Sequence, residues 1–206
     1  MKSMNDLFLS FLQDIYHAEK QGVRAIPKLV KAAESQELKD ALQQHREQSQ
    51  QQIERLEQVF EQIGKRARGK TCEAMQGLVA EGEEAIEDGE KGPVLDAALI
   101  ACEQGIEHYE IARYGTMVVW AKQLGMNEAA ELLRQSLAEE KEADRLLNEI
   151  AERSLNQKAA ESGAPDEESA RDDGGNKGDA GGDAGGAEQD EKRQPKPRAK
   201  RAAAKK

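Results

Sequence analysis

The amino-acid sequence predicts an all-α protein, an antiparallel four-helix bundle followed by a disordered tail. The first ~155 of the 206 residues form the folding part, and they are rich in Ala, Leu, Glu, Gln, Lys and Arg, which favour helices. No run in this part alternates apolar and polar residues as a strand would. Apolar residues instead recur at helical spacing in long segments separated by short turn signals.

The first predicted helix covers residues 4–33, with Ser3 or Asn5 as its N-cap. Pro27 lies inside this segment and is expected to kink or break the helix, because proline leaves the carbonyl of Val23 without its helical partner. The segment nevertheless keeps helical spacing on both sides of Pro27, so we treat it as one element.

Start and stop signals define the later helices. They place helices at residues 36–63, 73–88 (shorter and weaker), 93–125 and 127–157. The long helices have some 28–33 residues and are ~40 Å long at 1.5 Å per residue. Short turns join them in pairs, which gives two antiparallel hairpins, and the connection between the hairpins holds the short helix.

The domain prediction is a helical bundle over residues 1–158 and a tail over 159–206. Residues 161–191 hold eleven acidic and two basic residues (−9), whereas residues 192–206 hold eight basic residues and no acidic one (+8). The total of −10 therefore leaves −10 + 9 − 8 = −9 for the first 160 residues. The tail is rich in Gly, Asp, Lys and Arg and has almost nothing to bury, so we expect it to be disordered.

Two further observations bear on the compartment. No apolar run is long enough to span a membrane, and the N-terminus lacks the pattern of a signal peptide. Cys72 and Cys102 are thirty residues apart without CxxC spacing, so we expect ordinary thiols. The expected location is the cytoplasm.

Carboxylates interrupt the apolar rows of the predicted helices. One row in the first helix reads Leu12, Ile15, Glu19, Val23 and Ile26. Because a buried and unpaired charge is costly, Glu19 either reaches water or is paired or bound to a metal. The sequence His-Ala-Glu at residues 17–19 is echoed by His-Tyr-Glu at residues 108–110, which favours Glu19 and Glu110 as equivalent positions in two related hairpins.

The other long helices carry polar residues of the same kind. The candidate metal ligands are Glu19, His45, Glu107, Glu110, Glu140 and Asp144. Carboxylates that face one another repel and raise their own pKa values unless a cation neutralises them. Helical bundles hold di-iron or di-manganese centres with such residues, and a mostly oxygen ligand set suits Fe, Mn or Mg. The Glu-x-x-His spacing of such centres is absent from the second and fourth helices, which leaves open solvated carboxylates and a core role for His45.

Four segments carry a resemblance to a known family. They are DIYHAEKQ (14–21), EAMQGLVAEGEE (73–84), EHYEIARYGT (107–116) and LAEEKEADRLL (137–147). In this order and spacing they resemble the YciE/YciF-type ferritin-like family of bacteria, over roughly residues 4–155. The resemblance implies a ferritin-like bundle, often dimeric, with a di-metal centre and an association with stress responses.

The resemblance also implies site residues. Carried onto this chain they are Glu19, Glu107 or Glu110, Glu140 and Asp144, with second-helix positions around residues 45–52. Relatives often have Glu where this chain has Gln48, and the loss of a charged ligand there would weaken the site. Tyr114 and Trp120 are interpreted as packing residues.

Two functions of different classes follow from these observations. The first is a cytoplasmic ferritin-like stress protein, expected as a homodimer, whose iron or manganese centre oxidises Fe²⁺ or consumes peroxide. The second is a non-catalytic helical module that residues 192–206 hold on DNA or another polyanion. Because these residues lack aromatic side chains, such binding would be non-specific. We find no nucleophile with a neighbouring base and no phosphate-binding glycine loop, so the sequence names no reaction.

Overall fold

The computed structural model describes residues 1–162, and the predictions for the tail beyond them lie outside the described residues. The elements are α1 (Met4–Ala32), α2 (Gln36–Gln62), α3 (Glu73–Asp88), α4 (Pro93–Gln123), α5 (Asn127–Ile150), a π-helical turn (Ala151–Leu155) and α6 (Asn156–Ser162). Residues 1–162 contain no strand. The predicted all-α bundle with a short extra helix is confirmed.

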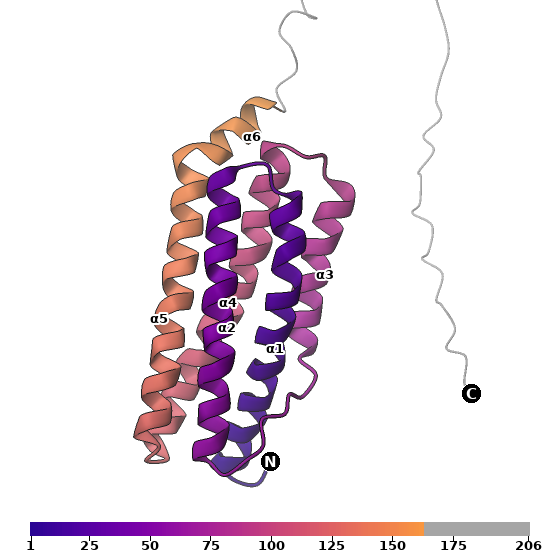
Figure 1. Ribbon diagram of the computed structural model, residues 1–206. Coiled ribbons are helices and arrows are strands. Elements are labelled where there is room, and N and C mark those ends of the chain that lie inside the picture. Colours follow the sequence, from indigo (N-terminus) through magenta and orange to yellow (C-terminus); the bar gives the residue numbers. More distant parts are fainter. Residues whose placement is uncertain (163–206) are drawn as a thin grey trace, which may run out of the picture. The chain divides into compact units, whose positions relative to one another are not determined.

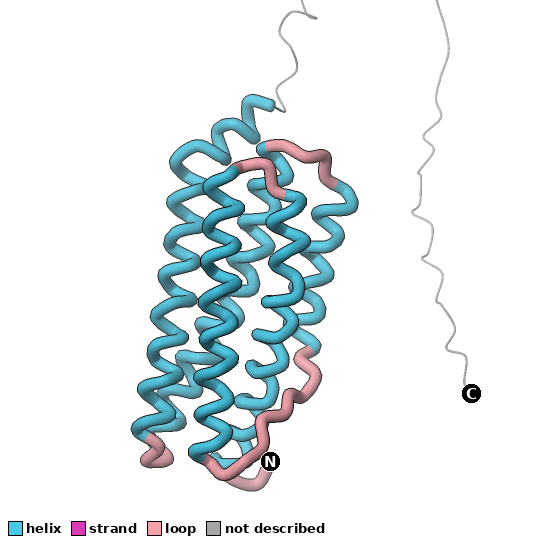
Figure 2. The backbone as a smooth tube through the Cα atoms, in the orientation of Figure 1, coloured by secondary structure: helices cyan, strands magenta, loops and turns pink. Residues whose placement is uncertain are grey.

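The four long helices form two antiparallel hairpins, α1 with α2 and α4 with α5 (Figure 1). Each of these helices packs against its hairpin partner and against one helix of the other hairpin, so that α1 contacts α4 and α2 contacts α5. The connection after α2 runs as a loop to α3, which lies outside the bundle against α1 and α4 (Figure 2). This crossover makes room for two hairpins to close around one interior.

Helix α1 continues through Pro27, so of the predicted kink or break, the break is wrong. Arg46 of α2 explains how the helix tolerates proline, because its Nε donates a hydrogen bond of 3.3 Å to the carbonyl of Val23. That carbonyl is the one that proline deprives of its helical partner. At the start of α1, Ser3 is the N-cap and its side chain accepts a hydrogen bond from the backbone N–H of Asp6.

The other helix ends follow the predicted signals closely. Gly64 and Gly125, which follow α2 and α4, have φ values of 65° and 73°, where glycine is favoured over other residues. The last long helix was predicted to run to residue 157, but α5 ends at Ile150 and a π-helical turn precedes α6. Asn127 was predicted as the cap of that helix and is its first residue instead.

Two apolar clusters fill the interior. The first includes Phe8, Leu56 and Met117, and the second includes Leu29 and Leu99. Along every long helix the residues of one cluster precede, and those of the other follow, a short stretch with buried polar side chains. We call the buried polar side chains of these four stretches the polar layer. Its members are Glu19, His45, Ser49, Gln52, Glu103, Glu107, Glu110, Ser136 and Glu140. The polar layer therefore divides the core at mid-height.

None of the helices within residues 1–162 combines the length and the apolar character that crossing a membrane requires.

Candidate metal centre

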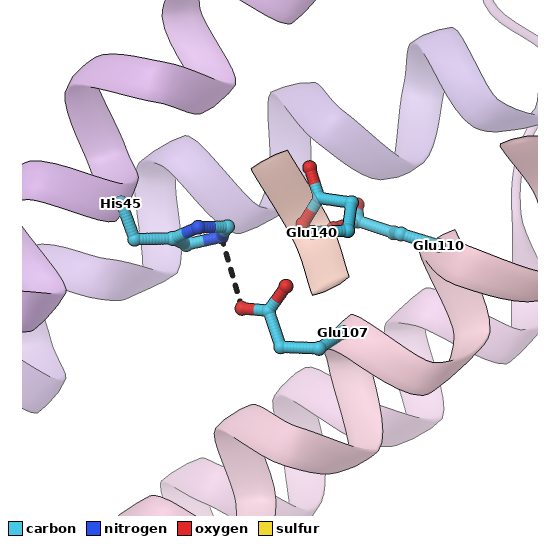
Figure 3. A group of neighbouring side chains, drawn as sticks. All are labelled: His45, Glu107, Glu110 and Glu140. Carbon is cyan, nitrogen blue, oxygen red and sulfur yellow. Dashed lines mark ion pairs between the residues drawn. The ribbon is translucent and has the colours of Figure 1, made fainter. Parts of the chain in front are cut away.

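Four side chains of the polar layer converge on one point (Figure 3). His45 comes from α2, Glu107 and Glu110 from α4, and Glu140 from α5, and each offers a ligand atom within 4.8 Å of those of the others. A metal–ligand bond is ~2.0–2.2 Å long, so two ligands of one ion lie at most ~4.4 Å apart. The four residues are therefore close to the arrangement that holds an ion.

Helix geometry accounts for the convergence. Glu107 and Glu110 are three residues apart on α4 and share one face of that helix. Both belong to a regular stripe that begins at Glu103 and ends at Tyr114, and each member of this stripe is buried. The antiparallel pairing of α4 with α5 brings Glu140, near the middle of α5, against the middle of α4.

The carboxylates of the layer lack partners. Both oxygens of Glu103, Glu107 and Glu140 are buried without a hydrogen bond, as are one oxygen of Glu19 and one of Glu110. His45 Nε2 lies 3.1 Å from Glu107 Oε1, while His45 Nδ1 is unpaired. Buried polar groups are normally satisfied, and the exceptions require an explanation. The donor set fits a cation, which would occupy these lone pairs.

Burial and mutual repulsion raise the pKa values of these groups. Burial raises the pKa of Glu107 and of Glu110 well above the usual 4.5, and the neighbouring charge of Glu140 raises both further. Burial and the charge of Glu140 likewise raise the pKa of Glu19, although a hydrogen bond from Tyr114 and the charge of Arg55 act in the opposite direction. Without a cation, protons would have to neutralise the layer.

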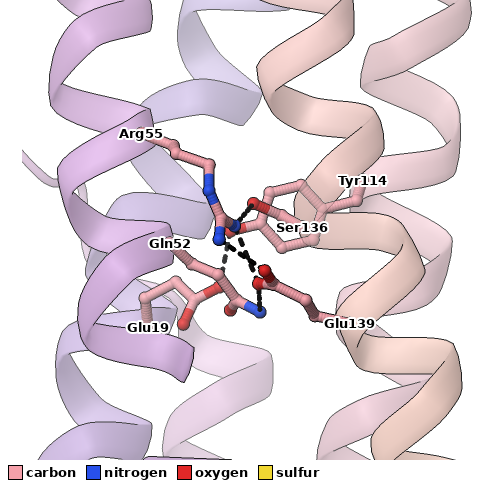
Figure 4. Close-up of polar contacts among 6 residues, drawn as sticks. All are labelled: Glu19, Gln52, Arg55, Tyr114, Ser136 and Glu139. Carbon is pink, nitrogen blue, oxygen red and sulfur yellow. Dashed lines mark hydrogen bonds and ion pairs between the residues drawn. The ribbon is translucent and has the colours of Figure 1, made fainter. Parts of the chain in front are cut away.

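Tyr114 holds Glu19 in place. Its hydroxyl donates a hydrogen bond of 2.5 Å to Glu19 Oε1, and both side chains are buried (Figure 4). The other oxygen of Glu19 has no partner. Tyr114 was interpreted as a packing residue, but its hydroxyl has this positioning role as well.

Arg55, whose charge acts on Glu19, is paired with another carboxylate. Arg55 donates hydrogen bonds to both oxygens of Glu139, at 2.8 Å and 2.5 Å, and a third to Ser136 (Figure 4). Gln52 Nε2 also donates to Glu139, at 3.1 Å. This network links α2 to α5 beside the carboxylates, and no lysine or arginine is among the buried polar residues of the described chain. Arg55 therefore lowers the pKa of Glu19 from a distance but forms no hydrogen bond with the unpaired oxygens of the layer.

The predicted ligands separate into two groups. His45, Glu107, Glu110 and Glu140 come together, and Glu19 faces them closely enough for its charge to affect Glu110. Asp144 is not brought together with them, because it is half-buried, accepts a hydrogen bond from Gln104 and lies 3.3 Å from His108. Cys72 and Cys102 are free thiols, as predicted.

Sequence reasoning missed Glu103. This side chain is 1% exposed, and its Oε1 lies 3.9 Å from His45 Nε2. Burial raises the pKa of Glu103 while the neighbouring His45 lowers it. The signal was present, since Glu103, Glu107, Glu110 and Tyr114 follow one another at spacings of four, three and four on α4.

Comparisons with known proteins point to one family. Residues 3–160 match the family described as Domain of unknown function (DUF892). The chain is 46% identical to Protein YciF of Escherichia coli strain K12 over 160 residues, which are 77% of this chain and 96% of that protein. The crystal structure of the E. coli stress protein YciF matches with a TM-score of 0.73 at 45% identity, over 77% of this chain and all of that chain. YcfI of Rhodopseudomonas palustris matches with a TM-score of 0.69 at 46% identity, over 71% of this chain and 94% of that chain.

Proposed function

This chain belongs to the DUF892 family and is similar to an E. coli protein that is described as a stress protein, and we propose that it too is a stress protein and that its polar layer holds a pair of iron or manganese ions. Such a pair would exchange electrons with dioxygen or peroxide and so support oxidation of Fe²⁺ or removal of peroxide. The observation that carries the proposal is the set of buried carboxylate oxygens without partners.

The residues have distinct tasks in this proposal. Glu107, Glu110 and Glu140 supply oxygen ligands and His45 supplies nitrogen, which makes a set that favours iron or manganese over copper. Glu19 completes the shell for a second ion, and Tyr114 fixes its orientation through their hydrogen bond. The two apolar clusters exclude water from both sides of the layer.

The described residues favour this function over the alternative of a non-catalytic binding module. Such a module needs only a stable bundle, and apolar residues in place of the layer would provide one without unpaired buried charge. The nucleic-acid contact of residues 192–206, the dimer and the cytoplasmic location stay predictions.

Metal analysis tests the proposal. Protein loaded with Fe²⁺ without oxygen, or with Mn²⁺, and then freed of excess metal should retain about two ions per chain. Glu140→Ala should lose most of this metal, whereas Glu142→Ala, a matched change at an exposed position of α5, should retain it. Full retention by the double variant Glu19→Ala/Glu140→Ala would refute the ligand set.

A further inference from the structure

A small cavity lies between α2 and α5 and reaches the polar layer from the surface. Its volume is about 40 Å³. His45 of α2 and Glu103 and Glu107 of α4 line its inner end, and Gln44 and Glu142, which are exposed, line its outer end. We call it the access cavity.

The access cavity exists because small side chains face each other across two helices. Ala41 of α2 and Ala143 of α5 both line it. A second small cavity, at the contact of α1, α3 and α4, is lined by apolar residues such as Leu29 and Leu78 and by no member of the polar layer. The access cavity is therefore positioned to connect solvent with the carboxylates.

Its size limits what can pass. A buried water needs a cavity of ~10–15 Å³ on the same measure, so a cavity of about 40 Å³ holds only a few waters or one ion with part of its water. An organic substrate does not fit. A divalent cation fits after it sheds most of its water, provided that a protein ligand replaces that water.

Glu103 is suited to be that ligand. It lines the access cavity, both of its oxygens are buried and without partners, and it is not one of the four residues that converge in Figure 3. His45 Nε2 lies between two carboxylates, 3.9 Å from Glu103 Oε1 and 3.1 Å from Glu107 Oε1. A cation could pass from Glu103 to Glu107 over a short distance along one face of α4.

The outer end of the access cavity has no unpaired carboxylate, unlike its inner end. Glu142 is exposed and already forms an ion pair with Arg145 on its own helix, at 2.5 Å. Gln48 lines the access cavity as a neutral and half-buried side chain. Of the three carboxylates that line the access cavity, Glu142 is paired with Arg145 and Glu107 belongs to the four converging residues, which leaves Glu103 as the unpaired carboxylate outside that group.

Building on the metal centre proposed above, we propose that divalent cations reach it through the access cavity and that Glu103 is a transit ligand on this route. Glu103 binds the cation while it loses water and passes it to Glu107 and His45. No bond other than those to the metal forms or breaks in this step.

The rate of Mn²⁺ uptake tests the route. The signal of free aqueous Mn²⁺ in electron paramagnetic resonance disappears on binding and can be followed in time after metal-free protein is mixed with Mn²⁺ alone. Ala143→Leu fills the access cavity and should slow uptake by about tenfold or more while leaving the final stoichiometry unchanged. Ala138→Leu, an equal change at an exposed position of the same helix, should have no effect.

Glu103→Gln tests the transit role with little change in volume. It should slow uptake by about tenfold and leave the final stoichiometry and the dissociation constant of the centre unchanged. A loss of stoichiometry or affinity would make Glu103 a ligand of the centre and overturn its transit role. Wild-type uptake rates in both Ala143→Leu and Glu103→Gln would overturn the route, whereas no Mn²⁺ uptake by wild-type protein would refute the centre itself.

Discussion

Two buried carboxylate sites in this bundle differ in what satisfies them. At the end of the bundle where α1 turns into α2, Asp96 is 1% exposed, and its two oxygens accept hydrogen bonds of 2.8 Å from the backbone N–H groups of Glu34 and Ser35. In the polar layer, Glu107 and Glu140 are equally buried, and none of their oxygens has a hydrogen-bond partner.

The difference distinguishes a carboxylate that stabilises the fold from carboxylates that are suited to bind a ligand. Asp96 joins α4 to the turn between α1 and α2 and satisfies backbone donors that would otherwise be orphaned. Glu140 has no such partner in the chain, and Glu107 has only His45, whose Nε2 lies 3.1 Å from Glu107 Oε1. Their burial costs stability, so a role beyond folding is the reason to retain them.

Replacing Asp96 tests the first half of this comparison and has the largest expected effect. Asp96→Ala should lower the free energy of unfolding by about 3 kcal/mol, because two backbone donors lose charged acceptors. Urea unfolding measures this change, and metal retention should stay unchanged. Asp88→Ala, at an exposed position, is the control, and an equally small effect at Asp96 would contradict the structural role.

Replacing Glu140 tests the second half and should have the opposite sign. Glu140→Gln should raise the free energy of unfolding of metal-free protein by about 1–2 kcal/mol at neutral pH, because it removes a charge that repels Glu19, Glu107 and Glu110. The same variant should retain less metal. Urea unfolding of metal-free Glu142→Gln provides the baseline. Destabilisation by Glu140→Gln would show that Glu140 has a structural partner.

The change in stability per pH unit should be the smallest of these effects. Glu19, Glu107 and Glu110 have pKa values raised above the usual 4.5, so the folded metal-free protein binds more protons than the unfolded chain. Their stabilising contribution is present below pH 4.5 and is lost as the pH rises through the raised pKa values. From about pH 8 to about pH 5 the stability of metal-free protein should rise by about 1 kcal/mol per unit.

Urea titrations across this range measure the slope. Bound metal should remove or reverse it, because protons then compete with the cation for the same oxygens. A flat profile for metal-free protein would mean that these carboxylates are already compensated.

The fold was predictable because the helix signals are local. Ser3, Ser35 and Gly64 mark helix ends in the sequence and do so in the structure. Two outcomes depended on contacts that local signals do not show. Arg46 supports α1 at Pro27 from another helix, and the π-helical turn that follows α5 contacts α4.

The sequence was sufficient to predict most of the residues of the candidate site but only part of their arrangement in space. Glu19, His45, Glu107, Glu110 and Glu140 interrupt apolar rows and were identified for that reason. Asp144 lies one helical turn beyond Glu140 and is equivalent to it in spacing alone, yet the rotation of α5 turns it toward Gln104 and His108. Such a rotation is fixed by packing between helices, which the sequence of one helix does not specify.

The polar layer also has a consequence for the conformational entropy of the bundle. His45, Glu107, Glu110 and Glu140 belong to three helices, and long stretches of chain separate His45, the pair Glu107 and Glu110, and Glu140. An ion held by all four would close large loops, as a disulfide does, but at several points at once and reversibly. Metal supply would then set the conformational freedom of the chain between α2 and α5, so a cell short of metal would contain a looser version of the same bundle.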